Sequence, residues 1–478
     1  MTHTKPRVRF APSPTGMMHL GNIRTALLNY LFAHQKGGTF VLRIEDTDPE
    51  RNFDPNATHI INDLIWLGLT YDEGPRVDGP YGPYFQSKRS DLYAKKLQEL
   101  QDKNAVYRCF CTPEELERKR KRQLALKRPP RYDQTCLHLT DTQIAQKLDT
   151  EAPFIWRLNT TDNRTITFND MARGTMEFHL KDFSDIPLTR TDGSFTFTFA
   201  NCVDDGLMKI THVLRGEDHI SNTTSQVVLY EALGLQVPTF WHIPIMCNIE
   251  GKKLSKRDFG FSLKDLQDAG FISEAILNYL GIIGGSFEQE IMSLEKLVQL
   301  FPFDAIHSTG HIKYDVEKLK WINHKWLSSY DTAQLTDMCL PRLIEAYPIA
   351  EAVNPETMRH LIGIIKPELV TLNDCVELIR FYFETPSVKQ EQLKKTIRPE
   401  KHEALIAILK ETVVSLDNPD TYMELTKQKA KSSGINSKEL WSSVRFILTG
   451  NVEGMGIHDI IDLLGIEEVK KRIHSVLD

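Results

Sequence analysis

Short apolar runs and one helical repeat alternate at the start of the chain. VRFA at 8–11 and TFVLRI at 39–44 are apolar enough to predict two buried strands. The segment between them predicts a helix over 22–34, because its apolar residues recur at helical spacing: Ile23, Leu27, Tyr30 and Leu31. A strand, a crossover helix and a second strand form the parallel, right-handed unit of a doubly wound α/β sheet. We therefore expect an α/β fold at the N-terminus.

The hydrophobic pattern changes along the rest of the chain. PFIWRL (153–158), TITF (165–168) and WHIPI (241–245) predict further strands. Beyond about residue 330 this strand patterning stops, and amphipathic helices with glycine stops follow. The clearest of these helices are ALIAILKETV (404–413), ELWSSVRFILTG (439–450) and HDIIDLLG (458–465). The sequence predicts an all-α C-terminal region.

The turn between the first strand and its helix, APSPTGMMHLGN at 11–22, has an unusual composition. Two prolines fix its path, Gly16 and Gly21 permit a nucleotide to approach the backbone, and His19 can donate to a phosphate. Ligands of such sheets lie at the carboxyl ends of strands, against helix N-termini that attract phosphate. Taken alone, an ordinary tight loop with a surface histidine explains the turn equally well.

Composition narrows the class of protein. A chain of 478 residues with 41% hydrophobic content can bury a large core and suggests three or more domains. The net charge of −6 argues against a uniformly basic nucleic-acid binder but not against local basic patches. Seven cysteines do not resemble a disulfide framework, and no run approaches the length of a membrane span. We expect a cytoplasmic protein with no membrane partner.

A lysine-rich loop, GKKLSKRD at 251–258, follows the strand predicted at 241–245. Lys253 and Lys256 flank Ser255, and two lysines three residues apart can close on a polyphosphate as a bond to its α-phosphorus forms. A solvated surface turn is the alternative for this loop alone. Together with the His-Leu-Gly turn far upstream, the loop indicates a nucleotide site.

These two motifs resemble the signatures of class I aminoacyl-tRNA synthetases, which have the forms HIGH and KMSKS. HLGN at 19–22 matches the first and KLSKR at 253–257 the second; Asn22 and Arg257 depart from the generic wording. Further blocks are similar to bacterial-type glutamyl-tRNA synthetases almost from end to end of the chain. They are RFAPSPTG (9–16), LRIEDTDPER (42–51), WLGLTYDEGP (66–75), YGPYFQSKR (81–89), VLRGEDH (213–219) and LNYLGIIG (277–284).

The resemblance implies an ATP-dependent activation of L-glutamate to glutamyl-adenylate. The glutamyl group is then transferred to the 3′-terminal adenosine of tRNA(Glu), and whether tRNA(Gln) is charged as well stays open. Mg²⁺ is expected with the ATP phosphates. The family also binds tRNA before it activates glutamate, and we expect a monomer. Catalysis is assigned to His19, Lys253 and Lys256, and ATP binding to Gly16, His19, Gly21, Lys253, Ser255 and Lys256.

The same resemblance implies a glutamate pocket. Arg9 and Arg215 are expected to hold the side-chain carboxylate of glutamate, while Ser13 and Glu45 hold its backbone, Glu45 pairing with the ammonium group. The complete expected set is Arg9, Ala11, Ser13, Glu45, Phe197, Asn201 and Arg215. Phe197 stands where the family has a tyrosine. A water or a neighbouring group replaces that hydroxyl, the register differs, or the affinity for glutamate is altered.

Cys109, Cys111, Cys136 and His138 form a C-x-C…C-x-H pattern. Three thiolates and an imidazole can form a closed tetrahedral zinc site, and many members of the family have this pattern in the domain that holds the acceptor end. We expect a structural Zn²⁺, because all four ligands are protein side chains. Reduced cysteines packed near a surface helix are the alternative.

Basic residues lie between the cysteines, in RKRKRQLALKRPPR at 118–131. Arg118, Arg120 and Arg122 are candidate tRNA contacts, although a solvated helix face is an alternative. Lys366 lies about where the family inspects the third anticodon base with an arginine or a glutamine.

The expected architecture is a doubly wound, Rossmann-like catalytic domain with an α+β zinc-containing insertion, followed by the all-α region. Its divisions are 1–90 and 195–250 for catalysis, 91–194 for the insertion, 251–330 for stem contact and 331–478 for anticodon binding.

Three other functions are alternatives. A short paralogue that modifies a base within tRNA lacks the helical tail, a small adenylyltransferase explains only the first motif, and a zinc-containing RNA-binding module leaves both nucleotide motifs idle.

Overall fold

A computed structural model describes residues 5–48, 50, 52–160, 164–255, 257–305 and 310–477. The chain divides into two compact units, and each is described by itself. Unit 1 comprises residues 1–265 and 276–316, and unit 2 comprises residues 266–275 and 317–478. Lys256, one of the predicted catalytic residues, lies outside the described residues.

The predicted strand–helix–strand unit is confirmed at the N-terminus. β1 (Arg7–Phe10) pairs in parallel with β2 (Thr39–Leu42), and α1 (Leu20–Gln35) connects them. The helical repeat predicted from the sequence is the buried face of α1: Ile23, Leu27 and Leu31 are fully buried. The burial of these side chains against the sheet stabilises the unit by about 1.5–3 kcal/mol each.

A second sheet continues the first. Its strand order is β6 (Gly174–His179), β5 (Thr165–Asp170), β8 (Thr239–Ile243) and β7 (His212–Gly216). β7 and β8 are parallel, β5 joins β8 in parallel at Asp170, and β5 pairs antiparallel with β6. The amide of Thr211, directly before β7, donates to the carbonyl of Arg7 at 3.0 Å, so β7 lies beside β1.

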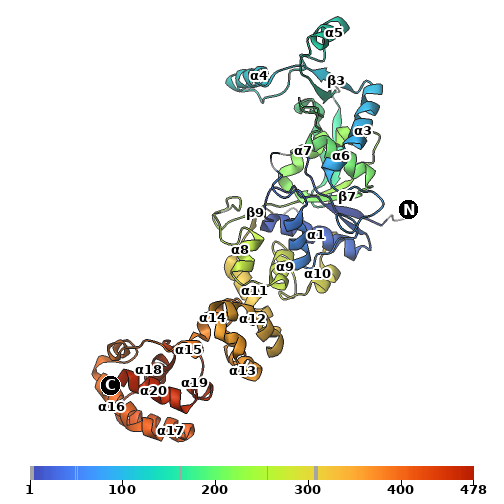
Figure 1. Ribbon diagram of the computed structural model, residues 1–478. Coiled ribbons are helices and arrows are strands. Elements are labelled where there is room, and N and C mark those ends of the chain that lie inside the picture. The colour runs from blue at the N-terminus through green and yellow to red at the C-terminus, as the bar shows by residue number, and fades with distance from the viewer. Residues whose placement is uncertain are drawn as a thin grey trace. The chain divides into compact units, whose positions relative to one another are not determined.

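Helices cover both faces of these strands. α6 (Phe197–Leu207) and α7 (Ile220–Ala232) lie on the face opposite α1 (Figure 1). Their apolar side chains share one core with the strands, which includes Val41, Phe199, Val213, Val227 and Phe240. The predicted doubly wound, Rossmann-like class is confirmed, with β6 as an antiparallel edge strand.

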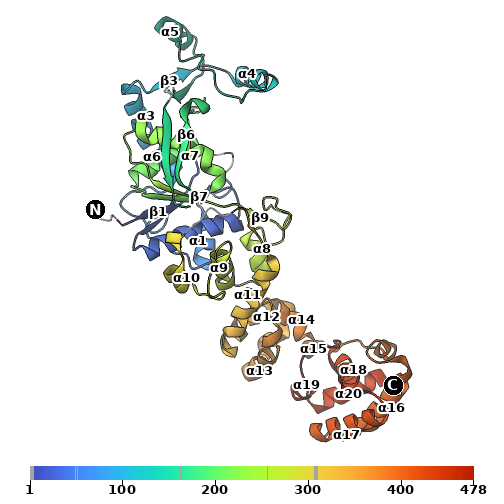
Figure 2. The same cartoon turned by 180° about the vertical axis from the view of Figure 1, so that it is seen from behind.

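The insertion of unit 1 contains a two-stranded antiparallel sheet, β3 (Val106–Cys109) with β4 (Ile155–Leu158). Its helices are α3 (Ser90–Asp102), α4 (Pro113–Ala125) and α5 (Asp141–Asp149). In both views α4 and α5 lie at the end of the insertion that is farthest from α1 (Figure 2). Unit 1 also contains α2 (Thr58–Trp66), β9 (Met246–Cys247), α10 (Leu294–Leu300) and β10 (Ile312–Lys313).

α8 (Leu263–Asp268) and α9 (Ser273–Ile282) each contribute residues to both units. The other helices of unit 2 are α11 (Val316–Ser329), α12 (Thr332–Ala346), α13 (Pro355–Ile365), α14 (Asp374–Leu378), α15 (Arg380–Phe383), α16 (His402–Thr412), α17 (Pro419–Ser432), α18 (Ser437–Thr449), α19 (Ile457–Leu464) and α20 (Ile466–Leu477).

The described residues of unit 2 contain helices and no strand, which confirms the predicted helical C-terminal region. The three helices predicted there correspond to α16, α18 and α19. Gly450 ends α18 with φ of 81°, a conformation that glycine adopts without strain. Among the described residues, no helix has the length and apolar character needed to cross a membrane.

Candidate active site

A cavity of about 360 Å³ opens in unit 1 where several parallel strands end. Its walls include Phe10 to Pro12 after β1, Arg215 and Gly216 at the end of β7, and Ile243 to Met246 after β8. The N-terminus of α1 closes another side with His19 and Gly21. The carboxyl edge of a doubly wound sheet is the usual ligand position in this class of fold, and the cavity occupies it.

His19 is the N-cap of α1. Its Nδ1 accepts from the amide of Asn22 at 3.3 Å, and the Asn22 side chain accepts in return from the His19 amide. Burial, together with the charge of Lys253, lowers the pKa of His19. The ring is therefore neutral near pH 7, and its proton is on Nε2. A Cβ at Gly21 would lie 3.0 Å from Cε1 of the ring, so a larger residue at this position would displace the imidazole.

The two signature segments lie together. The amide of Leu20 donates to the carbonyl of Phe261 at 3.0 Å, and the amide of Leu263 donates to the carbonyl of Met18 at 3.0 Å. The Phe261 ring also stacks on His19, with centroids 5.1 Å apart. The chain that follows the lysine loop is thus fixed against the His19 turn.

Lys253 lines the same cavity, and its Nζ lies 3.1 Å from Asp218 Oδ2. Its side chain is 66% exposed, so the ammonium group can exchange this partner for a ligand at small cost. Gly16 and Ser255 are not among the lining residues. Ser255 instead donates from its amide and its hydroxyl to Asp258 Oδ2, both at 2.9 Å, and shapes the loop.

The structure brings together six of the seven residues expected to bind glutamate. The lining set is Arg9, Ala11, Glu45, Phe197, Asn201 and Arg215. Ser13 is exposed and outside the lining set. Phe197 presents an apolar ring there, with its centroid 6.3 Å from that of His219. Burial and the charge of Arg215 lower the pKa of His219 to about 4, so this imidazole is also neutral.

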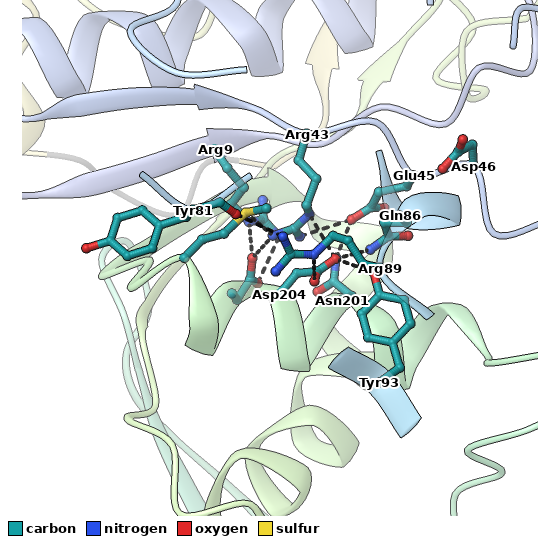
Figure 3. A network of polar contacts seen from close by, with 12 residues as sticks. Arg9, Arg43, Glu45, Asp46, Tyr81, Gln86, Arg89, Tyr93, Asn201 and Asp204 are labelled. Carbon is teal, nitrogen blue, oxygen red and sulfur yellow. Dashed lines mark hydrogen bonds and ion pairs between the residues drawn. The ribbon is translucent and has the colours of Figure 1, made fainter. Parts of the chain in front are cut away.

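Ion pairs connect a group of charged residues at one wall of the cavity, which we call the carboxylate–guanidinium network (Figure 3). Its members are Arg9, Arg43, Glu45, Arg89, Asp204 and Asp205. Arg43 is its centre and is fully buried. Its Nη1 donates to Asp205 at 2.7 Å and its Nη2 donates to Glu45 at 3.1 Å. Burial favours the neutral form of Arg43, but these carboxylates raise its pKa overall.

Arg215 is also buried, and it is paired differently. Its Nη2 donates to Thr223 Oγ1 at 2.6 Å and to Gln226 Oε1 at 2.5 Å. Among the described residues no carboxylate pairs with it, and its buried Nε has no partner. Burial, followed by the repulsion of Arg9, lowers the pKa of Arg215 to about 10. A buried cation without a counter-charge is costly unless a ligand supplies the anion.

The side-chain amides of Gln226 and Asn201 connect Arg215 to Glu45 through hydrogen bonds. Gln226 Nε2 donates to Asn201 Oδ1 at 3.1 Å, and Asn201 Nδ2 donates to Glu45 Oε1 at 2.6 Å. Burial raises the pKa of Glu45, against the opposing effect of Arg43. The cavity therefore offers a guanidinium and a carboxyl group to opposite ends of a small charged ligand.

Comparison with known proteins identifies the class of site. Residues 5–321 match the family described as the catalytic domain of class I tRNA synthetases (E and Q), and residues 334–477 match an anticodon-binding domain. The chain is 37% identical to the glutamate–tRNA ligase of Clostridioides difficile (strain 630), with 98% of each chain covered. The chain belongs to the glutamate–tRNA ligase family. The resemblance inferred from the motifs is confirmed.

Other relatives agree. The glutamate–tRNA ligase of Bacillus subtilis (strain 168) is 35% identical over 98% of this chain and 99% of its own. The crystal structure of a glutamate tRNA ligase from Elizabethkingia meningosepticum, in complex with its amino acid, is similar with a TM-score of 0.86, 32% identity and 99% coverage of both chains. Sequence and fold therefore place the protein in the same family of class I ligases.

The insertion brings three of the four predicted zinc ligands together. The sulfur atoms of Cys109, Cys111 and Cys136 lie within 4.8 Å of one another. His138 is exposed and lies outside this cluster. The hydroxyl of Tyr132 instead contacts Cys109 Sγ at 3.2 Å and accepts from the amide of Cys136 at 3.1 Å. The geometry supports a metal-binding cluster of three sulfurs, and His138 as a ligand stays a prediction.

The predicted basic segment forms α4. Arg118, Arg120 and Arg122 are exposed, and α4 has no buried residue, so its charges face solvent. A second cavity of about 430 Å³ lies at the base of α4; its cationic walls are Lys119, Arg120, Arg131 and Arg157. In unit 2, Lys366 is half-buried, and its ammonium group donates to the carbonyl of Tyr330.

Sequence reasoning missed the centre of the carboxylate–guanidinium network: Arg43, Asp204 and Asp205. The sequence contains an indication of this network. Arg43 interrupts the apolar run TFVLRI, and Asp204 and Asp205 directly follow the mainly apolar segment FTFANCV of α6. Charged residues at such positions are buried only when they are paired.

Proposed function

We propose that the protein joins L-glutamate to tRNA(Glu) in two steps that consume ATP. The observation that carries this proposal is Arg215, a buried guanidinium that no carboxylate of the described residues pairs with, in the cavity that also holds His19 and Lys253. The anionic side chain of glutamate supplies the missing counter-charge. The family membership of the chain supports the same substrate.

In the first step an α-carboxylate oxygen of glutamate attacks the α-phosphorus of ATP, and pyrophosphate leaves. His19 donates from Nε2 to the phosphate chain, since Nδ1 is occupied by the Asn22 amide. Lys253 and Lys256 stabilise the negative charge that develops on the phosphates during the reaction. A cation positioned in this way raises the rate by roughly 10²–10³-fold. Gly16, Gly21 and Ser255 shape the two loops around ATP. Bound Mg²⁺ neutralises phosphate charge.

Arg9 and Arg215 bind the side-chain carboxylate of glutamate, and Glu45 pairs with its ammonium group. Asn201 holds Glu45 in place, while Ala11, Ser13 and Phe197 complete the proposed pocket. Glutamine would leave Arg215 buried and without an anion. A site of this kind rejects the neutral analogue by about 10⁴-fold, so no editing domain is required.

In the second step a ribose hydroxyl of the terminal adenosine attacks the carbonyl carbon of glutamyl-adenylate, and AMP leaves. We assign the acceptor end of the tRNA to the insertion, residues 91–194. The exposed Arg118, Arg120 and Arg122 of α4 and the cationic second cavity support this assignment. Residues 1–90 and 195–250 form the catalytic domain in this proposal.

Residues 251–330 contact the tRNA stem and residues 331–478 bind the anticodon, with Lys366 near the third base. The match of 334–477 to an anticodon-binding domain supports the last assignment. The ammonium group of Lys366 donates one of its three hydrogens to the carbonyl of Tyr330, so a base can bind it without displacing Tyr330. We further propose that the enzyme acts as a monomer in the cytoplasm and that tRNA(Gln) is a possible second substrate.

We also propose a structural Zn²⁺ in the insertion. Cys109, Cys111 and Cys136 fit a thiophilic ion, and Lys119 Nζ lies 3.7 Å from Cys111 Sγ at the edge of the cluster. His138 is the fourth ligand expected from the sequence. The described residues contain one such cysteine cluster, so the purified protein should contain about one zinc per chain. Cys136→Ser should lose this zinc. A parent protein free of zinc would refute the site.

The test of the function is the transfer of labelled glutamate to separately transcribed tRNA(Glu) and tRNA(Gln), with ATP and Mg²⁺. Charging of tRNA(Glu) is the expected result, and labelled glutamine should not be transferred. Charging of tRNA(Gln) as well would keep the chemistry and widen the tRNA specificity. If neither tRNA accepts glutamate while both accept another amino acid, the proposed substrate is wrong.

A further inference from the structure

A line of buried polar groups leads away from the cavity behind Arg215. Thr223 Oγ1, which accepts from Arg215 Nη2, lies 2.7 Å from His242 Nε2. His242 Nδ1 lies 2.7 Å from Asp170 Oδ2. Thr223 and His242 are fully buried and Asp170 is 3% exposed, and none of the three lines the cavity. Thr223 reaches the proposed substrate site through Arg215, and its Oγ1 also lies 3.1 Å from the carbonyl oxygen of His219 in the cavity wall.

The direction of each hydrogen bond follows from the groups themselves. Ionised Asp170 can only accept, so His242 carries its proton on Nδ1 and donates it to Asp170. His242 Nε2 then accepts from the Thr223 hydroxyl. That hydroxyl keeps a lone pair for Arg215 Nη2. The carbonyl oxygen of His219 also lies within reach of the Thr223 hydroxyl, at 3.1 Å, but His242 Nε2 is the nearer acceptor at 2.7 Å. The line ends on the guanidinium.

Asp170 is itself held on several sides. Its Oδ1 accepts from the amides of Ala172 and Arg173, both at 2.9 Å, and its Oδ2 also accepts from the His242 amide at 3.0 Å. Arg173 donates to the carbonyl of His242 at 2.6 Å and to Glu217 at 2.7 Å. The end of β5 is therefore rigidly attached to β8 and to the loop after β7.

We propose that Asp170, His242 and Thr223 are positioning residues that fix the guanidinium of Arg215 for the side-chain carboxylate of glutamate. This inference rests on the proposed function. Arg215 Nη2 has two hydrogens, and Thr223 and Gln226 accept one each. With that corner fixed, the guanidinium plane cannot rotate, and its remaining N–H groups are kept for the ligand.

The predicted consequence is selective. Loss of the line should weaken binding of the glutamate side chain and relax the rejection of glutamine, because both depend on the orientation of Arg215. ATP binding should be unaffected, since His19 and Lys253 have no bond to this line among the described contacts.

Thr223→Val removes the hydroxyl and keeps the shape, and Thr223→Ser restores the hydroxyl. Thr224 is the matched control: it is the next residue, it is fully buried, and its hydroxyl has no hydrogen-bond partner among the residues that the structure describes. The readout is tRNA-dependent ATP–pyrophosphate exchange with glutamate and ATP varied in turn. Thr223→Val should raise KM for glutamate about 10-fold, with KM for ATP within about twofold of the parent.

Thr223→Ser should return KM for glutamate to within about threefold of the parent, and Thr224→Val should leave it there. His242→Gln, whose amide oxygen can accept from Thr223 but which lacks the ring Nδ1–H that donates to Asp170, should fall between Thr223→Val and the parent. Equal effects of Thr223→Val and Thr224→Val, or a parallel rise of KM for ATP, would overturn the inference. Thermal unfolding of each variant, measured alongside, identifies any that fails to fold, and Thr223→Ser then decides the question.

Failure of the inference is distinguishable from failure of the proposed function. If the parent protein does not exchange pyrophosphate with glutamate, the function is wrong. If the parent is active and Thr223→Val has an unchanged KM for glutamate, only the positioning role is wrong.

Discussion

Arg43 and Arg215 are both buried arginines beside one cavity, and they differ in their partners. Arg43 contacts Glu45, Asp204 and Asp205, whereas Arg215 contacts a hydroxyl and an amide. The pKa of Arg43 is raised by its carboxylates, and that of Arg215 is lowered to about 10 by burial and by Arg9. Burial is therefore common to both arginines, and their partners distinguish them. A guanidinium that is neutralised within the protein supports the fold, and we propose that the other one binds an anionic ligand.

The largest expected effect comes from breaking the paired side of this comparison. Arg43→Met leaves three buried carboxylates with too few cations. Removal of one partner from a buried ion pair costs about 3–5 kcal/mol, and we expect the free energy of unfolding to fall by that amount. Urea denaturation followed by circular dichroism measures it. A loss below about 1 kcal/mol, the size typical of an exposed ion pair, would mean that the network is not a structural element.

A second prediction concerns the two lysines of the loop at 251–258. Lys256→Ala should abolish adenylate formation, and Lys253→Ala should lower its rate by roughly 10²–10³-fold. Neither change should alter stability or the affinity for tRNA, because the Lys253–Asp218 pair is exposed. Pyrophosphate exchange and filter binding measure the two quantities. Normal exchange by Lys256→Ala would contradict the role given to the loop.

The third prediction uses the neutral histidine beside Arg215. The pKa of His219 is lowered from 6.5 to about 4 by burial and by Arg215. Above pH 6.5 neither the folded nor the unfolded form binds this proton; between pH 6.5 and 4 only the unfolded form does. Stability should therefore fall as the pH falls through this window, by about 1–2 kcal/mol at pH 5 from this residue.

His219→Gln should remove that part of the pH dependence. Urea denaturation at pH 7.5 and pH 5 measures the difference for both proteins. His19 and His242, whose pKa values are also lowered by burial, keep part of the slope in the variant. An identical slope in parent and variant would mean that His219 is not held neutral.

The smallest expected effect is on the stability of the unpaired side. Arg215→Met removes a buried charge that pairs with no carboxylate in the described part of the chain, so the free energy of unfolding should change by no more than about 1 kcal/mol or should rise. The same urea assay as for Arg43→Met provides a matched pair of identical substitutions. A loss as large as that of Arg43→Met would remove the distinction between the two arginines.

Much of the fold was predictable because it follows local patterns. The spacing of Ile23, Leu27 and Leu31 predicted α1, and the apolar runs on either side predicted β1 and β2. Gly450 marked the end of α18. The joining of β5 to β8 at Asp170 was not predictable in this way, because a single residue pair between segments 70 residues apart leaves no periodic signal.

The candidate site was predictable where motifs carry it and not where packing decides it. His19, Glu45 and Arg215 lie at the cavity as expected. The pairing of Arg43 with Asp205 and the line from Thr223 to Asp170 join residues from separate elements, so they appear only in three dimensions. The exposure of His138 is likewise set by the path of its loop rather than by the C-x-H spacing.

The central claim is that Arg215 is completed by the carboxylate of the substrate, and discrimination between glutamate and glutamine tests it most directly. The measurement is kcat/KM for each amino acid in tRNA-dependent pyrophosphate exchange, for the parent and for Arg215→Met. The parent should favour glutamate by about 10⁴-fold, and the variant should fall below about 10²-fold through loss of glutamate activity. An unchanged ratio in the variant would show that another group recognises the carboxylate.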